Sequence, residues 1–285
     1  MKLSHSIGTV VTGIAGAIML AFLVLPMISV YLDMAPGKLW EQLTTPVAVQ
    51  ALQLSVLTTF ISLGLILLFG TPLAYFLANR EFPGKRVLEV VLQLPIVIPP
   101  AVAGVGLLLV FGRYGLIGQW LSAAGIGVAF STTAVIMAQS FVAAPFYIQG
   151  ARTAFAGVDP NLVSVSRTLG ISPAKTFFRV VFPLALPGLI SGAALSWGRA
   201  LGEFGATIMF AGNLPGKTQT LPLAIYSAMQ SDLGVAIAIS ALLITVGFCL
   251  LLLVKLVELW PKRKQKSGKK EGRQRAQMQR PENAS

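Results

Sequence analysis

Six stretches of the 285-residue chain are long and apolar enough to cross a lipid bilayer as helices. A crossing helix needs about 20 mostly apolar residues, because about 30 Å of hydrocarbon is spanned at about 1.5 Å per residue. The six stretches are 9–32, 50–78, 88–111, 130–150, 183–210 and 233–259. Only 11% of the residues are charged, against about 25% in soluble domains. We therefore expect an all-α, polytopic membrane protein, and the composition argues against a soluble enzyme, a disordered chain or a disulfide-rich domain.

Lysine and arginine in the connecting segments predict the orientation, because these residues are enriched on the cytoplasmic side of membrane proteins. With the N-terminus inside, eighteen of the 22 Lys and Arg residues fall on the cytoplasmic side and three fall outside. Without the basic C-terminal segment the ratio is still nine to three. The remaining basic residue, Arg199, lies within an apolar stretch. We predict six transmembrane helices with both termini in the cytoplasm (N-in/C-in).

The residue types that build metal and redox sites are scarce. The chain has one histidine, His5, and one cysteine, Cys249, so neither an internal disulfide nor a histidine-based metal site can form. We expect no metal, no cofactor and no catalytic residue. The net charge of +12 does not indicate nucleic-acid binding, since residues 262–285 alone hold nine Lys or Arg against two Glu. Such a segment cannot bury enough surface to fold alone, and we expect a disordered tail beside anionic lipid.

The long connecting segment 151–182 begins with signals for a short helix. Asp159 is a good N-cap, and the proline that follows it, Pro160, is favoured in the first turn. Gly170 suits the left-handed residue that ends a helix. The spacing therefore predicts a helix that starts at Pro160 and ends at Gly170.

The second half of that segment repeats the pattern. Ser172 and Pro173 start another helix, expected over 173–180, and this helix should stop before Pro183. Phe177 and its apolar neighbours are too hydrophobic for a solvated loop. Two short helices with exposed apolar side chains would dock onto a partner protein or pack under the protein's own bundle, and the residues alone leave both alternatives open.

This segment resembles the EAA loop of bacterial ABC importer permeases, which reads Glu-Ala-Ala, three residues, Gly, nine residues, then Ile-x-Leu-Pro. Gly170 and Pro183 fall on the Gly and the Pro of that pattern, whereas Ser164 stands where the family has its Glu. In the family this loop is the coupling helix, which sits in a cleft of the cytoplasmic ATPase subunit. The resemblance places these residues in the coupling loop: Asp159, Ser164, Arg167, Gly170, Pro173, Phe177 and Pro183.

The resemblance extends from about Gln50 to Lys255 and is clearest over 198–226, GRALGEFGATIMFAGNLPGKTQTLPLAIY. This run is similar to the permeases of molybdate importers and, less closely, of sulfate importers. It implies a type I ABC importer permease fold, working as a homodimer with ATPase subunits inside and an anion-binding protein outside. The outer loop 211–232 would face that binding protein through Asn213, Pro215, Gly216 and Lys217.

The same resemblance divides the chain into three parts. Residues 1–49 form the first transmembrane helix and an outer loop, 50–258 form the permease core that contains the coupling loop 151–182, and 259–285 form the basic tail. The implied function is the ATP-driven import of molybdate across the cell membrane, with sulfate, thiosulfate or tungstate as the alternative anions. ATP hydrolysis would belong to a separate subunit.

Arg199 and Glu203 are an acid–base pair inside an apolar stretch, and a spacing of four places them on one face of a helix. Charges at membrane depth usually pair, face a cavity and serve function. If this face lines the pathway, Arg199 would contact the anion and Glu203 would orient it or act in a gate; otherwise the pair is structural. The nearby Gly188 and Gly192 predict close helix packing, within the chain or across a dimer axis.

Three other interpretations are weaker. Residues 211–218, AGNLPGKT, loosely match a nucleotide-binding P-loop, but an apolar span rather than a strand precedes them. A self-sufficient secondary anion transporter or channel predicts an inverted repeat or more intramembrane acids, and the sequence shows neither. A membrane-embedded enzyme would need a nucleophile–base pair or a metal cluster, which the composition does not offer.

Overall fold

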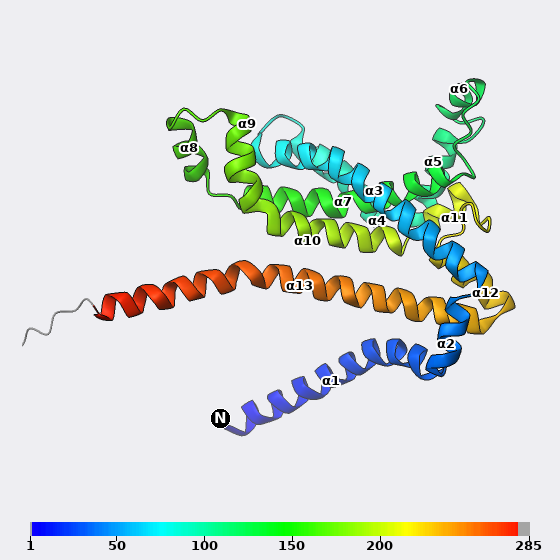
Figure 1. Cartoon of the computed structure of the whole chain (residues 1–285), viewed down its shortest axis with the longest axis horizontal. Helices are drawn as coiled ribbons and strands as arrows, with labels where there is room; N and C mark the ends of the chain where they lie inside the picture. The colour runs from blue at the N-terminus through cyan, green and yellow to red at the C-terminus, as the bar shows by residue number, and fades with distance from the viewer. Residues whose placement is uncertain (1, 279–285) are drawn as a thin grey trace, which may run out of the picture. The chain divides into compact units, whose positions relative to one another are not determined.

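The computed structural model describes the backbone of residues 2–278 and the side chains of residues 12–256, and every regular element in that part is a helix. The chain forms two compact units, residues 1–55 with 213–246 and residues 56–212 with 247–285 (Figure 1). The all-α prediction is confirmed.

Long helices and short amphipathic ones alternate along the chain. The elements of the first unit are α1 (Lys2–Leu32), α2 (Pro36–Leu43), α12 (Leu221–Ser231) and the first parts of α3 (Pro46–Asn79) and α13 (Leu233–Met278). The second unit holds the rest of α3 and α13 together with α4 (Lys85–Val97), α5 (Pro100–Phe111), α6 (Gly118–Ala123), α7 (Thr132–Ala156), α8 (Pro160–Thr168), α9 (Pro173–Thr176), the π-helical turn η1 (Phe177–Val181), α10 (Phe182–Leu201) and α11 (Gly205–Ala211).

Five helices of the described part are long and apolar enough to span a membrane, or six if α4 and α5 count as one span. The expected single helix over 88–111 is wrong, because α4 and α5 are bent by 111° at Ile98 and Pro99. Pro100 lacks the N–H that would continue α4, and a residue that precedes a proline favours the extended conformation that Ile98 adopts. A multi-pass membrane protein is confirmed; the number of spans and the orientation stay predictions.

Two further boundaries differ from expectation. The stretch 183–210 is not one helix, since α10 ends at Leu201 and α11 begins at Gly205. The short helix expected over 173–180 does not stop before Pro183, but continues through η1 into α10. In η1 the Phe182 N–H donates to the carbonyl five residues back, and this wider turn accommodates the missing N–H of the proline that follows.

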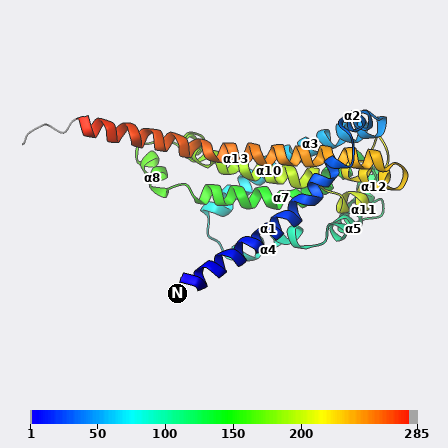
Figure 2. The same ribbon diagram turned by 90° about the horizontal axis from the view of Figure 1, so that it is seen from below.

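The core of the second unit is the antiparallel pair α7 and α10, which lie side by side in Figures 1 and 2. Small residues bring the two backbones together: a Cβ on Gly188 would lie 2.6 Å from the Ala154 Cβ, and one on Gly150 would lie 3.0 Å from the Gly192 Cα. The buried Ser196 hydroxyl donates to the Ala143 carbonyl over 2.8 Å. The packing predicted from Gly188 and Gly192 is therefore found within the chain.

Two expected loops hold regular structure. The outer loop 211–232 contains α12, which begins at Leu221 with Pro222 in its first turn. At the C-terminus α13 runs to Met278, while residues 279–285 and all side chains after Leu256 lie outside the described part. The disordered tail and the three-part division of the chain stay predictions.

Candidate functional site

Two broken helices meet within the second unit, and we call this place the broken-helix junction (residues 98–104 and 202–206). A Cβ on Gly205 would lie 2.9 Å from the Pro100 Cβ, and a Cβ on Gly104 would lie 2.7 Å from the Ala206 carbonyl oxygen. Both glycines are therefore needed for α11 to pack against α5. Non-helical backbone at membrane depth is tolerated where it is buried in protein or lines a water-filled cavity, as in transporters with broken helices.

The Arg199–Glu203 pair lies at this junction and connects its two helices. Arg199 is in the last turn of α10, and its guanidinium is 2.6 Å from Glu203 Oε2. The other carboxylate oxygen, Oε1, accepts the backbone N–H of Ala206 over 2.8 Å, which satisfies a first-turn donor of α11. Glu203 therefore pairs with Arg199 and caps α11 at the same time.

The two members of the pair differ in exposure. The Glu203 side chain is 0% exposed, whereas the Arg199 side chain is 28% exposed. A guanidinium carries five N–H donors and a carboxylate engages only part of them. Arg199 can thus hold Glu203 and still present donors toward its exposed side, where an anion could approach.

Buried polar side chains connect α3, α7 and α10 beside this region, and sequence reasoning missed them. The Ser62 hydroxyl lies 3.2 Å from Gln139 Oε1, and the Trp197 indole donates to Thr59 Oγ1 over 3.1 Å. Within the described residues the buried Gln139 Nε2 has no hydrogen-bond partner. Thr59 and Ser62 recur on one helical face of an apolar span, which is the signal that could have revealed this polar belt.

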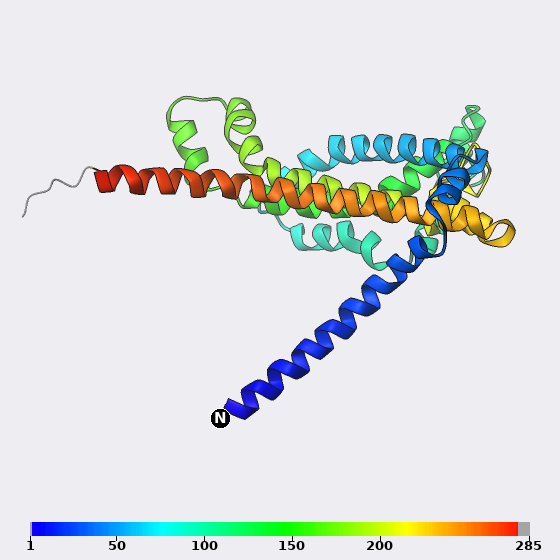
Figure 3. The ribbon, with the colours of Figure 1, turned by 60° about the horizontal axis from the view of Figure 1, so that its bottom comes forward.

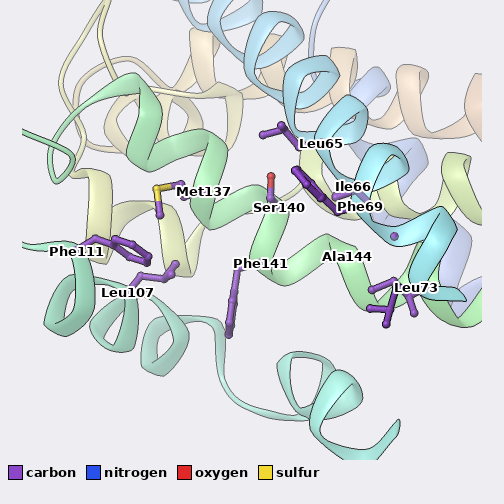
Figure 4. Close-up of a pocket in the computed structure, with 12 residues that line it drawn as sticks. Leu65, Ile66, Phe69, Leu73, Leu107, Phe111, Met137, Ser140, Phe141 and Ala144 are labelled. Carbon is purple, nitrogen blue, oxygen red and sulfur yellow. The ribbon is translucent and has the colours of Figure 1, made fainter. Parts of the chain in front are cut away.

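An apolar cavity of about 430 Å³ lies between α3, α5 and α7 (Figure 4). Leu65, Phe69, Leu107 and Phe141 are typical of its walls, and the single oxygen among the drawn side chains belongs to Ser140. A doubly charged oxyanion needs cationic or several hydrogen-bonding groups. This cavity is therefore not a candidate for an oxyanion site.

The two short helices predicted in 151–182 are present as α8 and α9, which lie side by side in Figure 3. The Asp159 carboxylate accepts the Asn161 N–H over 2.9 Å, as expected of an N-cap, and Gly170 has a φ of +74° just after α8. The buried hydroxyls of Ser166 and Thr176 are 2.9 Å apart and connect the two helices. We call residues 157–181 the coupling segment.

The coupling segment has one outward and one inward face. Leu162, Val165 and Leu169 are exposed at helical spacing on α8, together with Ser164 and Arg167. In contrast, α9 passes into an inward aromatic cluster, described next. The two alternatives that the residues left open therefore apply to different faces of the same segment.

Phe177 is the centre of the inward cluster. Its ring centroid is 4.8 Å from that of Tyr75 on α3 and 6.0 Å from that of Phe155 on α7. Pro173 and Pro183, at the two ends of the turn that contains Phe177, are exposed. Through this ring the coupling segment is packed directly against α3 and α7.

The predicted outer-loop residues lie in the first unit, where hydrogen bonds hold the loop. The Asn213 amide donates to the Ser227 hydroxyl over 2.8 Å and accepts from Gln219 Nε2 over 3.0 Å. Pro215, Gly216 and Lys217 are exposed at the tip, where Gly216 has a φ of +69°. The network fixes the base of the loop and presents its tip.

Comparison with known proteins gives a consistent assignment. The family model described as "Binding-protein-dependent transport system inner membrane component" matches residues 70–263. The molybdenum transport system permease protein ModB of Mycobacterium tuberculosis is 44% identical over 232 residues, covering 80% of this chain and 86% of that protein. ModB of Escherichia coli K12 is 39% identical over 209 residues, covering 72% and 90%. The sulfate transport system permease protein CysT of Synechocystis is 32% identical over 250 residues, covering 86% and 87%.

Solved structures of ABC transporters share the fold. A chain of the bacterial alginate ABC transporter, in complex with its alginate-bound periplasmic protein, matches with a TM-score of 0.64 at 17% identity, covering 89% of this chain and 93% of that one. A chain of the inward-facing MetNI methionine ABC transporter matches with a TM-score of 0.57 at 19% identity, covering 79% and 98%. The family match, the relatives and the shared fold lead to one conclusion: the chain belongs to the family of binding-protein-dependent transport system inner membrane components.

Proposed function

We propose that this protein is the permease subunit of an ATP-driven importer of a tetrahedral oxyanion, and that the anion is molybdate. The observation that carries the proposal is the partly exposed Arg199 at the broken-helix junction, in a chain 44% identical to a molybdenum permease. Sulfate and tungstate are the nearest alternatives, since a sulfate permease is also a relative.

In this proposal Arg199 attracts the anion and Glu203 limits how tightly it is held. A dianion gains from the guanidinium and is repelled by the carboxylate 2.6 Å from it. A transport site must bind well enough to admit the ion and weakly enough to release it. Because Glu203 also caps α11, a shift of this helix end would change the distance between the carboxylate and Arg199.

The coupling segment connects this site to the energy source. We propose that the exposed face of α8, with Leu162, Val165 and Leu169, docks into a separate cytoplasmic ATPase subunit. Movement of α8 would reach the transmembrane helices through Phe177, which contacts both Tyr75 and Phe155. The permease itself performs no covalent chemistry in this scheme.

The remaining partners follow from the same proposal. Two copies of the chain would enclose the pathway between them, and an anion-binding protein would dock on the tip formed by Pro215, Gly216 and Lys217. ATP binding would close the ATPases, draw the coupling segments together and open the cavity outward. ATP hydrolysis would return the cavity to the inward-open state.

Uptake into proteoliposomes tests the proposal. The permease, its ATPase and its binding protein are reconstituted with radiolabelled molybdate outside and ATP inside, and excess unlabelled tungstate, sulfate or phosphate is added in parallel. We expect ATP-dependent uptake that tungstate inhibits and sulfate inhibits less. Uptake driven by an ion gradient without ATP would favour a secondary transporter, and stronger inhibition by sulfate would reassign the substrate.

A further inference from the structure

A second arginine–glutamate pair connects α4 to α7 in the same unit. Arg152 and Glu89 form an ion pair whose side chains are 37% and 22% exposed. The pair lies in a cleft of about 80 Å³ that also contains the side chains of Gln93, Gln149 and Thr153. The cleft is therefore polar and open, unlike the apolar cavity between α3, α5 and α7.

The cleft offers groups that a tetrahedral oxyanion requires. The Arg152 guanidinium can bind two oxygens of such an anion in parallel. Gln93 and Gln149 are exposed and carry amide donors, while the Thr153 hydroxyl donates to the Gln149 carbonyl over 3.0 Å. Glu89 is the one acidic group that lines the cleft, and it would oppose anion binding as long as it stays beside Arg152.

The pair is able to open. Both charges are partly exposed, and ion pairs of this kind are weak because water and salt screen them. Neither carboxylate nor guanidinium is needed to end a helix here, since Glu89 and Arg152 both lie inside regular helices. An anion can replace Glu89 at Arg152 without unwinding any element.

The position of the cleft relates it to the Arg199 site. Gly150 faces Gly192 across the antiparallel pair α7 and α10, so Arg152 is level with about residue 190. Nine residues of helix separate that level from Arg199, a distance of roughly 15 Å along the axis. Arg152 thus lies toward the coupling segment, which follows α7 after Ala156.

We propose that the Arg152 cleft is a second binding site for a tetrahedral oxyanion group, in which the anion takes the place of Glu89. The inference rests on the proposed function where the ligand is the transported anion, which would leave the Arg199 site and pause here before release. The phosphate of an anionic lipid has the same chemistry, and the experiment separates the two sources.

The test is equilibrium binding of radiolabelled molybdate to the detergent-purified permease–ATPase complex, without binding protein. Arg152→Gln should lose one class of sites, and Arg152→Lys should retain it in part. Glu89→Gln should tighten binding at that class by roughly tenfold, because the competing carboxylate is gone. Arg86→Gln, a change to an exposed arginine of α4 outside the cleft lining, is the matched control and should bind as the wild type does.

The opposite response of the two partners distinguishes a site from a structural ion pair. A structural pair predicts that Glu89→Gln leaves binding unchanged or weakens it, and that result would overturn the proposal even if Arg152→Gln fails to fold. Native mass spectrometry provides the lipid arm: an anionic lipid retained by the wild type and lost in Arg152→Gln, with no molybdate bound, would assign the lipid phosphate. Neither ligand bound would overturn the site.

These outcomes are independent of the proposed function. Molybdate uptake by the wild-type complex tests the proposed function directly. Wild-type uptake without an Arg152-dependent class of sites would remove only the second site. Lipid retention that depends on Arg152, in a complex that transports another substrate, would support the cleft and remove only molybdate import.

Discussion

The two arginine–glutamate pairs of the second unit use the same residue types in different ways. Glu203 is fully buried, and each of its oxygens has a partner, one in Arg199 and one in the Ala206 N–H. Glu89 and Arg152 are both partly exposed and come from separate, regular helices. The first pair is thus part of the backbone structure of the junction, whereas the second can separate while its helices stay intact. Burial, rather than the chemistry of the pair, decides which one the fold depends on.

The largest effect should follow removal of the buried carboxylate. Glu203→Gln leaves Arg199 without its counter-charge, which costs about 2.5–3.5 kcal/mol at membrane depth. Glu203→Leu also removes the acceptor for the Ala206 N–H and should cost about 1 kcal/mol more. Thermal unfolding of the purified complex in detergent measures both. A loss no larger than that for Glu89→Gln would contradict the comparison.

A change in the coupling segment should be separable from both pairs. Gly170 has a φ of +74°, and a β-branched residue there costs roughly 1–2 kcal/mol. Gly170→Val should therefore weaken ATPase co-purification while the protein still inserts into the membrane. The control is Gly157→Val, because Gly157 has a φ of −78° that valine adopts without strain. Normal co-purification of Gly170→Val would show that the turn after α8 is not needed for docking.

The exposed pair should contribute little to stability. Glu89→Gln is expected to lower the unfolding free energy by only about 0.2–1 kcal/mol, the range of partly exposed ion pairs. The same thermal assay measures this change, and added salt should reduce it further. A salt-independent loss as large as that of Glu203→Gln would show that the Arg152 pair holds α4 in place.

The smallest effect is expected at the C-terminus. Truncation at Pro261 removes a segment rich in Lys, Gln and Arg that has no apolar face to pack. Assembly on gel filtration and uptake by proteoliposomes should both remain near the wild-type level. Failure of the truncated chain to assemble would identify the tail as a partner site.

Local signals in the sequence predicted the coupling segment well and the helix breaks poorly. Asp159, Gly170 and Ser172 act through hydrogen bonds and backbone angles within a few residues, so their roles can be inferred from neighbours alone. The break after Leu201 has no proline to announce it. It depends on the approach of Gly205 to Pro100 and on Glu203 capping α11, which only the fold brings together.

The same argument applies to the charged residues. Arg199 and Glu203 are four apart, so the helical repeat alone predicts that they meet. Glu89 and Arg152 lie on different helices, and no periodicity relates them. The polar contact between Ser62 and Gln139 likewise requires the packing of α3 on α7. Sequence reasoning therefore finds a site where its members are close in the chain.

The central claim is that Arg199 contacts the transported anion, and uptake by Arg199→Gln and by the double variant Arg199→Gln/Glu203→Gln tests it most directly. Stability and molybdate uptake are scored separately in a double-mutant cycle, so that a folding defect is not mistaken for lost transport. We predict that the double variant regains stability, because no unpaired charge remains, yet takes up no molybdate although its ATPase still hydrolyses ATP. Recovery of uptake in the double variant would contradict the account and show that the pair is structural.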